Sequence, residues 1–255
     1  MNDIIGFYQQ LGWPVFSWVL SVFILAGLVK GVIGLGLPTV AMGLLGLAMA
    51  PVQAAALLIV PSMLTNAWQL AAGGHLRGLL VRLWPLLLAV FIGTLGAGLF
   101  LGVSGEPWVK RALGGVLVVY ALAGLFLPAL AIAPRHEGWL GFVCGLATGC
   151  ITALTGVFVI PAVPYLQALG LQRDELVQAL GLSFTVSTLA LGLSLYGQAA
   201  LGGAELGASL VVLAPALAGM WLGQWLRRRI NALLFKRAFF VGILLLGLHL
   251  SITPP

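Results

Sequence analysis

The stretches LVKGVIGLGLPTV (28–40) and LATGCITALTGVFVIPAVPYL (146–166) decide the fold of this chain. Both are apolar, yet both are crowded with Gly, Pro and Thr, and they occupy corresponding places in the two halves. Proline removes a backbone donor and disfavours helix in the residue before it. Interrupted apolar segments at matching positions of two repeats are typical of the binding site of a membrane transporter.

The composition around these stretches is that of an all-α integral membrane protein. Of the 255 residues, 61% are hydrophobic and only 7% are charged, whereas a soluble domain carries about 25% charged residues. Twelve basic residues outnumber six acidic ones, and in a membrane protein such an excess marks cytoplasmic loops. The densest basic cluster, 227–237, is therefore interpreted as an anchor at membrane lipids, and no nucleic acid is expected as a partner.

The apolar segments divide into eight long and two short elements. They fall at roughly 14–35, 37–50, 52–72, 79–101, 109–130, 139–156, 157–170, 176–197, 204–226 and 234–252. A membrane-spanning helix needs about 20 residues, so 37–50 and 157–170 are short. These two elements are either thin, steep spans or re-entrant segments.

The order of short motifs predicts an internal duplication into two homologous repeats, 1–135 and 136–255, each with about five hydrophobic elements. VQA occurs at 52–54 and 177–179, and KRA occurs at 110–112 and 236–238. Each match alone could arise by chance, but an ordered series at nearly constant spacing indicates a repeat.

The distribution of Lys and Arg orients the repeats. If the short elements cross the membrane, each half has five spans and the second half is inverted. The basic residues other than Lys30 then divide nine to two, with only Lys110 and Arg111 on the minority side. If the short elements re-enter, each half has four spans and the division is eight to three. We prefer the inverted five-plus-five arrangement, and both alternatives place both termini in the periplasm.

Polar side chains gather on two of the spans. Ser62, Thr65, Asn66 and Gln69 follow the i, i+3, i+4, i+7 spacing of one helix face, and the matching segment carries Ser183 and Ser187 one turn apart. Such groups often form hydrogen bonds between packed membrane helices, worth about 0.6 kcal/mol each. As a group, the face on 62–69 carries more donors and acceptors than one neighbouring helix would use, and we interpret it as the lining of a pathway.

The predicted breaks, near 34–38 and 152–161, would leave half-helix N-termini near the membrane midplane. Such ends present free N–H groups and a partial positive charge that favours anions. Lys30, the one cation far from a polar loop, either extends from a helix end toward water or balances an anion. All six carboxylates fall in termini or connections, so neither a proton relay nor a cation cage is expected. Nothing resembles a metal cluster, a cofactor motif or a nucleophile–base pair, and we do not expect an enzyme.

At these residues the chain resembles the bacterial sulfite exporter family known as TauE/SafE, over essentially its whole length. The matching motif positions are Gly34, Gly36, Pro38, Gly156 and Pro161. The sequences GLGLP and LTGVFVIP at these places depart from the run of three glycines that is usual in the family. The resemblance implies export of sulfite, or of an organosulfonate such as sulfoacetate, across the bacterial inner membrane.

The hypothesis is that a small anion binds between the two broken segments, held by backbone N–H groups at 34–39 and 152–156 and by side-chain donors. The expected binding residues are Lys30, Gly34, Gly36, Pro38, Thr39, Ser62, Thr65, Asn66, Gln69, Thr152, Thr155, Gly156, Ser183 and Ser187. An anion channel or an uptake permease is the transport alternative, and a membrane scaffold or lipid-handling protein is the alternative of another class. Glycine-rich faces would also allow a homodimer.

Overall fold

The computed structural model describes residues 2–71, 73–101, 107–127 and 131–252, and every regular element in these ranges is an α-helix. This confirms the predicted all-α class. The helices are α1 (Asn2–Ile33), α2 (Leu37–Leu45), α3 (Pro51–Ala71), α4 (Leu76–Leu101), α5 (Pro107–Phe126), α6 (Pro134–Thr155), α7 (Ala162–Gln167), α8 (Arg173–Gly197), α9 (Gly203–Val211), α10 (Leu213–Leu226) and α11 (Ala232–Ile252).

Eight helical segments of 19 to 25 residues are long and apolar enough to cross a membrane, with α9 and α10 together forming one of them. The two short elements are shorter as helices than expected. At about 1.5 Å per residue, the nine residues of α2 and the six of α7 span roughly 14 and 9 Å, less than half of a hydrocarbon core of about 30 Å. Non-helical backbone at 34–36 and 156–161 precedes α2 and α7.

Each short segment runs back along the long helix that precedes it. The indole N–H of Trp18, near the start of the apolar part of α1, donates to the carbonyl of Leu44 at the end of α2 (3.2 Å). In the second half the hydroxyl of Tyr165 on α7 donates to the carbonyl of Glu137 at the start of α6 (2.8 Å). The chain therefore returns, in both halves, to the end of the molecule where α1 or α6 began.

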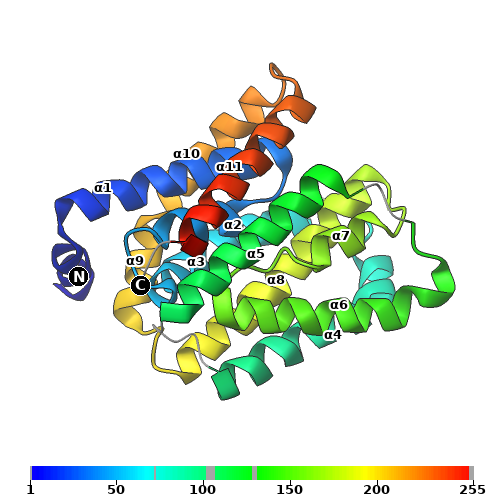
Figure 1. Ribbon diagram of the computed structural model, residues 1–255, viewed down its shortest axis with the longest axis horizontal. Helices are drawn as coiled ribbons and strands as arrows, with labels where there is room; N and C mark the ends of the chain where they lie inside the picture. Colours follow the sequence, from blue (N-terminus) through cyan, green and yellow to red (C-terminus); the bar gives the residue numbers. More distant parts are fainter. Residues whose placement is uncertain (1, 72, 102–106, 128–130, 253–255) are drawn as a thin grey trace.

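Contacts between helix ends fix the direction of the two halves. The Arg82 guanidinium on α4 pairs with the Glu137 carboxylate on α6 (2.7 Å), and the amide of Gln178 on α8 donates to the carbonyl of Gly73 after α3 (2.8 Å). The amide of Gln69, near the end of α3, donates to the carbonyl of Gly34 after α1. The end of α1 thus lies where α6 starts, so the halves run in opposite directions, as in the inverted arrangement (Figure 1).

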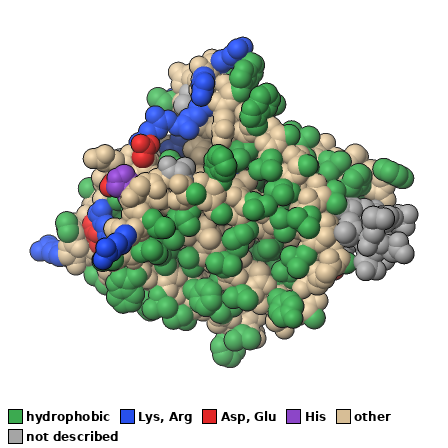
Figure 2. All heavy atoms as spheres, turned by 180° about the vertical axis from the view of Figure 1, so that it is seen from behind, with side chains coloured by type: hydrophobic (Ala, Val, Ile, Leu, Met, Phe, Trp, Pro, Cys, Tyr) green, Lys and Arg blue, Asp and Glu red, His purple; other side chains and the backbone are tan. Residues whose placement is uncertain are grey.

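The connections α3–α4, α5–α6, α7–α8 and α10–α11 meet at one end of the molecule, called here the basic end. Nine basic residues are in or beside these connections: Arg77, Arg82, Arg135, Arg173, Arg227, Arg228, Arg229, Lys236 and Arg237. Figure 2 shows Lys and Arg side chains gathered toward one end of the face in view, whose remainder is largely hydrophobic. This is the nine-to-two division expected for five elements per half.

The helix pairs repeat between the halves. The most extensive contacts are those of α4 with α6, α1 with α10, α5 with α11 and α3 with α8. If α1, α3, α4 and α5 of the first half correspond to α6, α8, α10 and α11 of the second, the α1/α10 pair corresponds to the α6/α4 pair. The α3/α8 and α5/α11 pairs each correspond to themselves. Glycines permit both the α1/α10 pair and the α6/α4 pair, because a Cβ on Gly27 or on Gly145 would lie 2.1 or 2.4 Å from a carbonyl oxygen of the facing helix. The division at residue 135 stays a prediction.

Candidate functional site

The first predicted break is present and separates α1 from α2. The helix α1 ends at Ile33, and the backbone then passes through Gly34 (φ +86°) and Gly36 (φ +103°). These left-handed values favour glycine, and a Cβ on Gly36 would also lie only 3.0 Å from the Val29 side chain. Pro38 follows in the first turn of α2, where its missing N–H is harmless.

The N-terminus of α2 has no side-chain cap. The first helical hydrogen bond runs from the Val40 N–H to the Gly36 carbonyl (2.9 Å). The N–H groups of Leu37 and Thr39 precede this bond, and no acceptor for them is recorded in the described part of the chain. A helix N-terminus with free donors carries a partial positive charge.

Lys30 lies one turn before this break and is buried, with 3% of its surface exposed. Its Nζ donates to Thr65 Oγ1 (3.0 Å) and to Asn66 Oδ1 on α3. Among the described residues the salt bridge is Arg82–Glu137, so no carboxylate there pairs with Lys30. A buried ammonium held only by neutral oxygens lacks the opposite charge that would offset its desolvation.

The polar face of α3 joins this lysine to both halves. Gln69 Nε2 donates to the Gly34 carbonyl (2.7 Å), which ties α3 to the break. Asn66 Nδ2 donates to Thr188 Oγ1 on α8 (3.3 Å). Thr188 was absent from the predicted set, although it lies one residue after Ser187 and is equally buried. Its place in the run of hydroxyl side chains at 183–188 is the signal that could have identified it.

Several buried oxygens around this network have no hydrogen-bond partner among the described residues. They are Thr39 Oγ1, Ser62 Oγ, Gln69 Oε1, Ser183 Oγ and the hydroxyl of Tyr120. The first four belong to the predicted binding residues. Leaving a buried polar atom unsatisfied disfavours the fold by about 1–3 kcal/mol, so each instance calls for an explanation.

Ser62 and Ser187 lie where α3 and α8 cross. Gly181 faces Gln69 and Leu70, while Gly192 faces Ile59, so the two helices are antiparallel and the serines lie between these two contacts. The spacing of the VQA motifs makes Ser62 and Ser187 equivalent positions of the two repeats. Ser62 and Ser187 therefore occupy corresponding positions, each about halfway along its helix.

The second break begins later than predicted, and the expected free N–H groups at 152–156 were wrong. The helix α6 continues through Thr155, and the Gly156 N–H donates to the Thr152 carbonyl (2.8 Å). The hydroxyls of Thr152 and Thr155 donate to carbonyls four residues earlier, at 2.7 Å each. Threonines with such bonds are tolerated within a helix, so this end of α6 presents carbonyls and not N–H donors.

The two interrupted segments nevertheless meet. Gly156 (φ +69°) lies against Met42 of α2, since a Cβ there would approach the Met42 side chain to 2.9 Å. No recorded hydrogen bond links Thr152, Thr155 or Gly156 to the Lys30 network within the described chain. The structure thus brings together Lys30, Gly34 and the α3 face, with Thr188 from α8, and leaves the three residues at the end of α6 as a separate, locally satisfied group.

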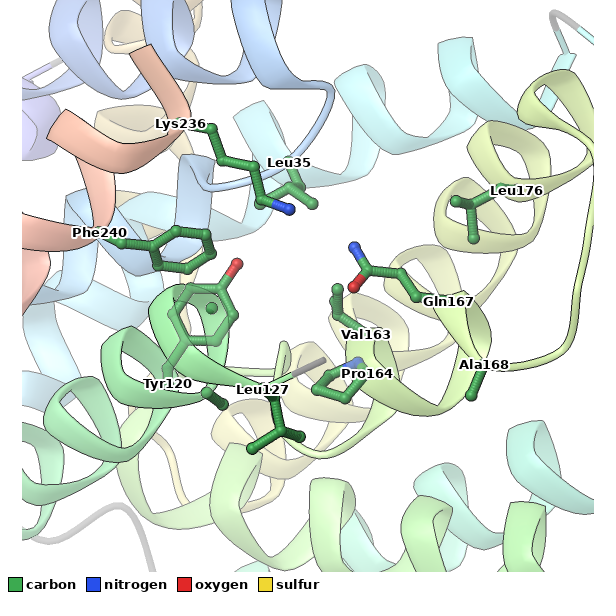
Figure 3. Close-up of a pocket in the computed structure, with 12 residues that line it drawn as sticks. Leu35, Tyr120, Leu127, Val163, Pro164, Gln167, Ala168, Leu176, Lys236 and Phe240 are labelled. Atoms are coloured by element: carbon green, nitrogen blue, oxygen red, sulfur yellow. The ribbon is translucent and has the colours of Figure 1, made fainter. Parts of the chain in front are cut away.

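A cavity of about 360 Å³ opens beside the breaks and contains none of the fourteen predicted residues. Leu35, between Gly34 and Gly36, and Pro164, after the second break, both line it. Its polar lining comes from Tyr120, Gln167 and Lys236, which point toward the cavity from α5, α7 and α11 (Figure 3). Sequence reasoning did not group these three: Lys236 was assigned to the basic cluster 227–237 as a lipid anchor, and no sequence pattern brings Tyr120 and Gln167 to it.

The chain was compared with known proteins. Neither the curated proteins nor the solved structures gave a match. A family model described as sulfite exporter TauE/SafE matches residues 19–250, which is nearly the whole chain.

Proposed function

Because this chain belongs to the sulfite exporter TauE/SafE family, a family of membrane transporters, we propose that it exports a small sulfur-containing anion. The proposed solute is sulfite or an organosulfonate such as sulfoacetate, and the proposed location is the inner membrane of a bacterium. The basic end would face the cytoplasm, following the positive-inside rule, and both termini the periplasm.

The observation that carries the proposal is Lys30. Its ammonium group is buried beside the break between α1 and α2, and its acceptors among the described residues are the neutral oxygens Thr65 Oγ1 and Asn66 Oδ1. The cost of burying a charge falls when an opposite charge joins it. A transported anion at Lys30 would provide that charge during each cycle.

The surrounding donors suit the oxygens of such an anion. The free N–H groups at the start of α2 and the hydroxyls of Thr39, Ser62 and Ser183, which have no partner among the described residues, come from α2, α3 and α8, and α3 packs against both of the others. All of these are neutral donors. One cation among neutral donors would bind an anion weakly enough to release it, whereas a cage of several cations would retain it.

Membrane voltage would favour the proposed direction. Moving one negative charge out of a cell with a negative interior gains about 2.3 kcal/mol per 100 mV. Outward transport then needs no coupled proton, which agrees with the location of the carboxylates outside the polar network. Alternating access would follow from the motion of one repeat against the other.

Efflux from proteoliposomes tests this proposal. Vesicles loaded with labelled sulfite or sulfoacetate should lose the label through the protein, and efflux should saturate with concentration. A valinomycin-imposed potential that is negative inside should accelerate the loss. Flux that does not respond to voltage would contradict electrogenic export, and discrete single-channel currents in place of saturable counterflow would identify a channel. An absence of flux for every sulfur oxyanion tested would reject the proposed substrate class.

A further inference from the structure

The cavity of about 360 Å³ lies at the basic end, between α5, α7, α8 and α11. Hydrophobic side chains such as Leu127, Leu176 and Phe240 form much of its wall. Three polar groups interrupt this wall. Figure 3 shows the hydroxyl of Tyr120, the amide of Gln167 and the amine of Lys236 directed toward the same space.

These three groups share one chemistry, because each can donate a hydrogen bond. Tyr120 is 2% exposed, and its hydroxyl has no hydrogen-bond partner within the described residues. Lys236 contacts the face of Phe240, 5.8 Å from the ring centroid, and no carboxylate pairs with it in the part of the chain described. A cation, a phenol and an amide around one cavity are suited to an anion with several acceptor oxygens.

The cavity also lies on the route from the basic end to the first break. Leu35 belongs to its wall and is flanked by Gly34 and Gly36, whose backbone turns the chain from α1 into α2. The Gly34 carbonyl accepts a hydrogen bond from Gln69, on the same α3 face that holds Lys30. The broken segment therefore borders the cavity through Leu35 and the Lys30 network through Gly34.

Equivalent positions of the two repeats carry different side chains at this cavity. The KRA motifs make Lys236 equivalent to Lys110 and place Leu246 at the position that corresponds to Tyr120. Leu246 lies against Gly43 of α2, where a Cβ would be 2.6 Å from its side chain. The position that holds a hydroxyl in the first cavity is thus occupied by a leucine in the other repeat, where it lines a cavity of about 310 Å³ with apolar walls.

We propose that the cavity lined by Tyr120, Gln167 and Lys236 is a second anion site, which captures the solute at the basic end before it reaches Lys30. This rests on the proposed function, since it assumes that the solute is a small oxyanion such as a sulfite or sulfonate. The phosphate of a lipid headgroup shares that chemistry, and the open wall of the cavity would admit it. Free anion is the occupant favoured here, because the unpartnered Tyr120 hydroxyl lies deep in the cavity.

The test uses the full-length protein in inside-out and right-side-out vesicles, with Lys236→Gln and Tyr120→Phe as variants. Both should raise the half-saturating sulfite concentration about tenfold when anion is offered at the basic end, since each removes a hydrogen bond to a charged group. The maximal rate should not change. Lys110→Gln, at the equivalent position of the other repeat, is the matched control and should leave the half-saturating concentration at the basic end unchanged. Unchanged values for both cavity variants would overturn the proposal.

Binding separates this inference from the proposed function. Sulfite should raise the thermal unfolding midpoint of the purified wild-type protein, and the double variant Tyr120→Phe/Lys236→Gln should reduce that shift. A variant-sensitive shift without any flux would reject the export proposal and retain the site. Flux that is the same in the wild type and the variants would retain the export proposal and reject the site. If neither flux nor a thermal shift is observed, both proposals are rejected. Stabilisation by anionic lipid but not by sulfite, compared in detergent with and without phosphatidylglycerol, would assign the cavity to a headgroup and overturn the proposal.

Discussion

At the scale of single residues, the molecule places one buried cation among neutral groups. Lys30 donates to Thr65 and Asn66, and Asn66 in turn donates to Thr188 on α8. This chain of contacts links an end of α1 to the second half. Apolar side chains at these buried positions would cost less free energy than a charged one. Binding of a negatively charged solute beside Lys30 would offset that cost.

Replacing Asn66 with Ala should reduce solute flux about tenfold or more. The change removes an acceptor of the Lys30 ammonium, and a hydrogen bond to a charged group is worth about 1.5–3 kcal/mol. Gln53→Ala on the same helix is the matched control, because Gln53 is exposed. Initial rates of efflux from proteoliposomes measure both. A scaffold role would instead lower the unfolding midpoint of the Asn66 variant and leave flux intact.

Ser62 and Ser209 form a second informative pair. The Ser62 hydroxyl is buried and has no partner in the part of the chain that the structure describes. The Ser209 hydroxyl donates to the Leu57 carbonyl (2.7 Å) and accepts from the Val60 N–H (3.0 Å). Ser62→Ala should therefore keep or raise the unfolding midpoint while weakening solute binding. Ser209→Ala should destabilise by about 1–3 kcal/mol, because it removes the buried donor to the Leu57 carbonyl, and Pro61, four residues later, has no N–H to replace it. Denaturation curves and binding titrations on both variants check this. A large loss of stability on removing the Ser62 hydroxyl would show that it has a structural partner.

At the scale of elements, glycine faces set the close helix pairs. A Cβ on Gly27 would lie 2.1 Å from the Ala216 carbonyl oxygen, so α1 and α10 touch backbone to backbone. Gly27→Ala should destabilise by about 1–3 kcal/mol, the usual range for overpacking. Gly96→Ala on α4 has nothing within 4 Å of the added Cβ and should have little effect. Thermal unfolding in detergent compares the two, and equal midpoints would mean that α1 and α10 separate easily.

The positions of the elements were largely predictable from the sequence, and their local chemistry was less so. Gly34, Gly36 and Pro38 located the first break in the sequence. The structure gives the reason, since both glycines have positive φ values that few other residues adopt. The second break was placed too early, since the hydroxyls of Thr152 and Thr155 bond within α6 and let the helix continue to Gly156. Helical periodicity identified the polar face of α3, but it does not say which helices meet. Only the folded structure therefore shows that Tyr120, Gln167 and Lys236 line one cavity.

At the scale of the whole molecule, the direction of the halves can be tested with single cysteines in a background lacking Cys144 and Cys150. Leu47→Cys, after α2, should react with an impermeant maleimide in intact cells. Gly74→Cys, between α3 and α4, should react only after the cells are opened. Four spans per half would reverse both results. Gly197→Cys at the end of α8 is the control, because both arrangements place it outside.

The paired helices suggest how the whole molecule would move. α1 with α10 and α4 with α6 are joined by close glycine contacts, while α3 crosses α8 at the polar centre (Figure 1). The two tight pairs would act as rigid bodies, and the polar crossing would change when one moves against the other. Cavities of about 360 and 310 Å³ lie beside these helices, the first with polar side chains in its wall and the second with apolar ones.

The most direct measurement of the central claim is sulfite or sulfonate flux by Lys30→Met, with Lys110→Met as the control. Lys30→Met removes a buried charge that has no opposite partner among the described residues but also removes the donor to Asn66 Oδ1. The unfolding midpoint of each variant, measured beside its flux, separates a loss of function from misfolding. We expect saturable flux to fall to the level of empty vesicles in Lys30→Met and to persist in Lys110→Met. Wild-type flux and affinity in folded Lys30→Met protein would contradict the account.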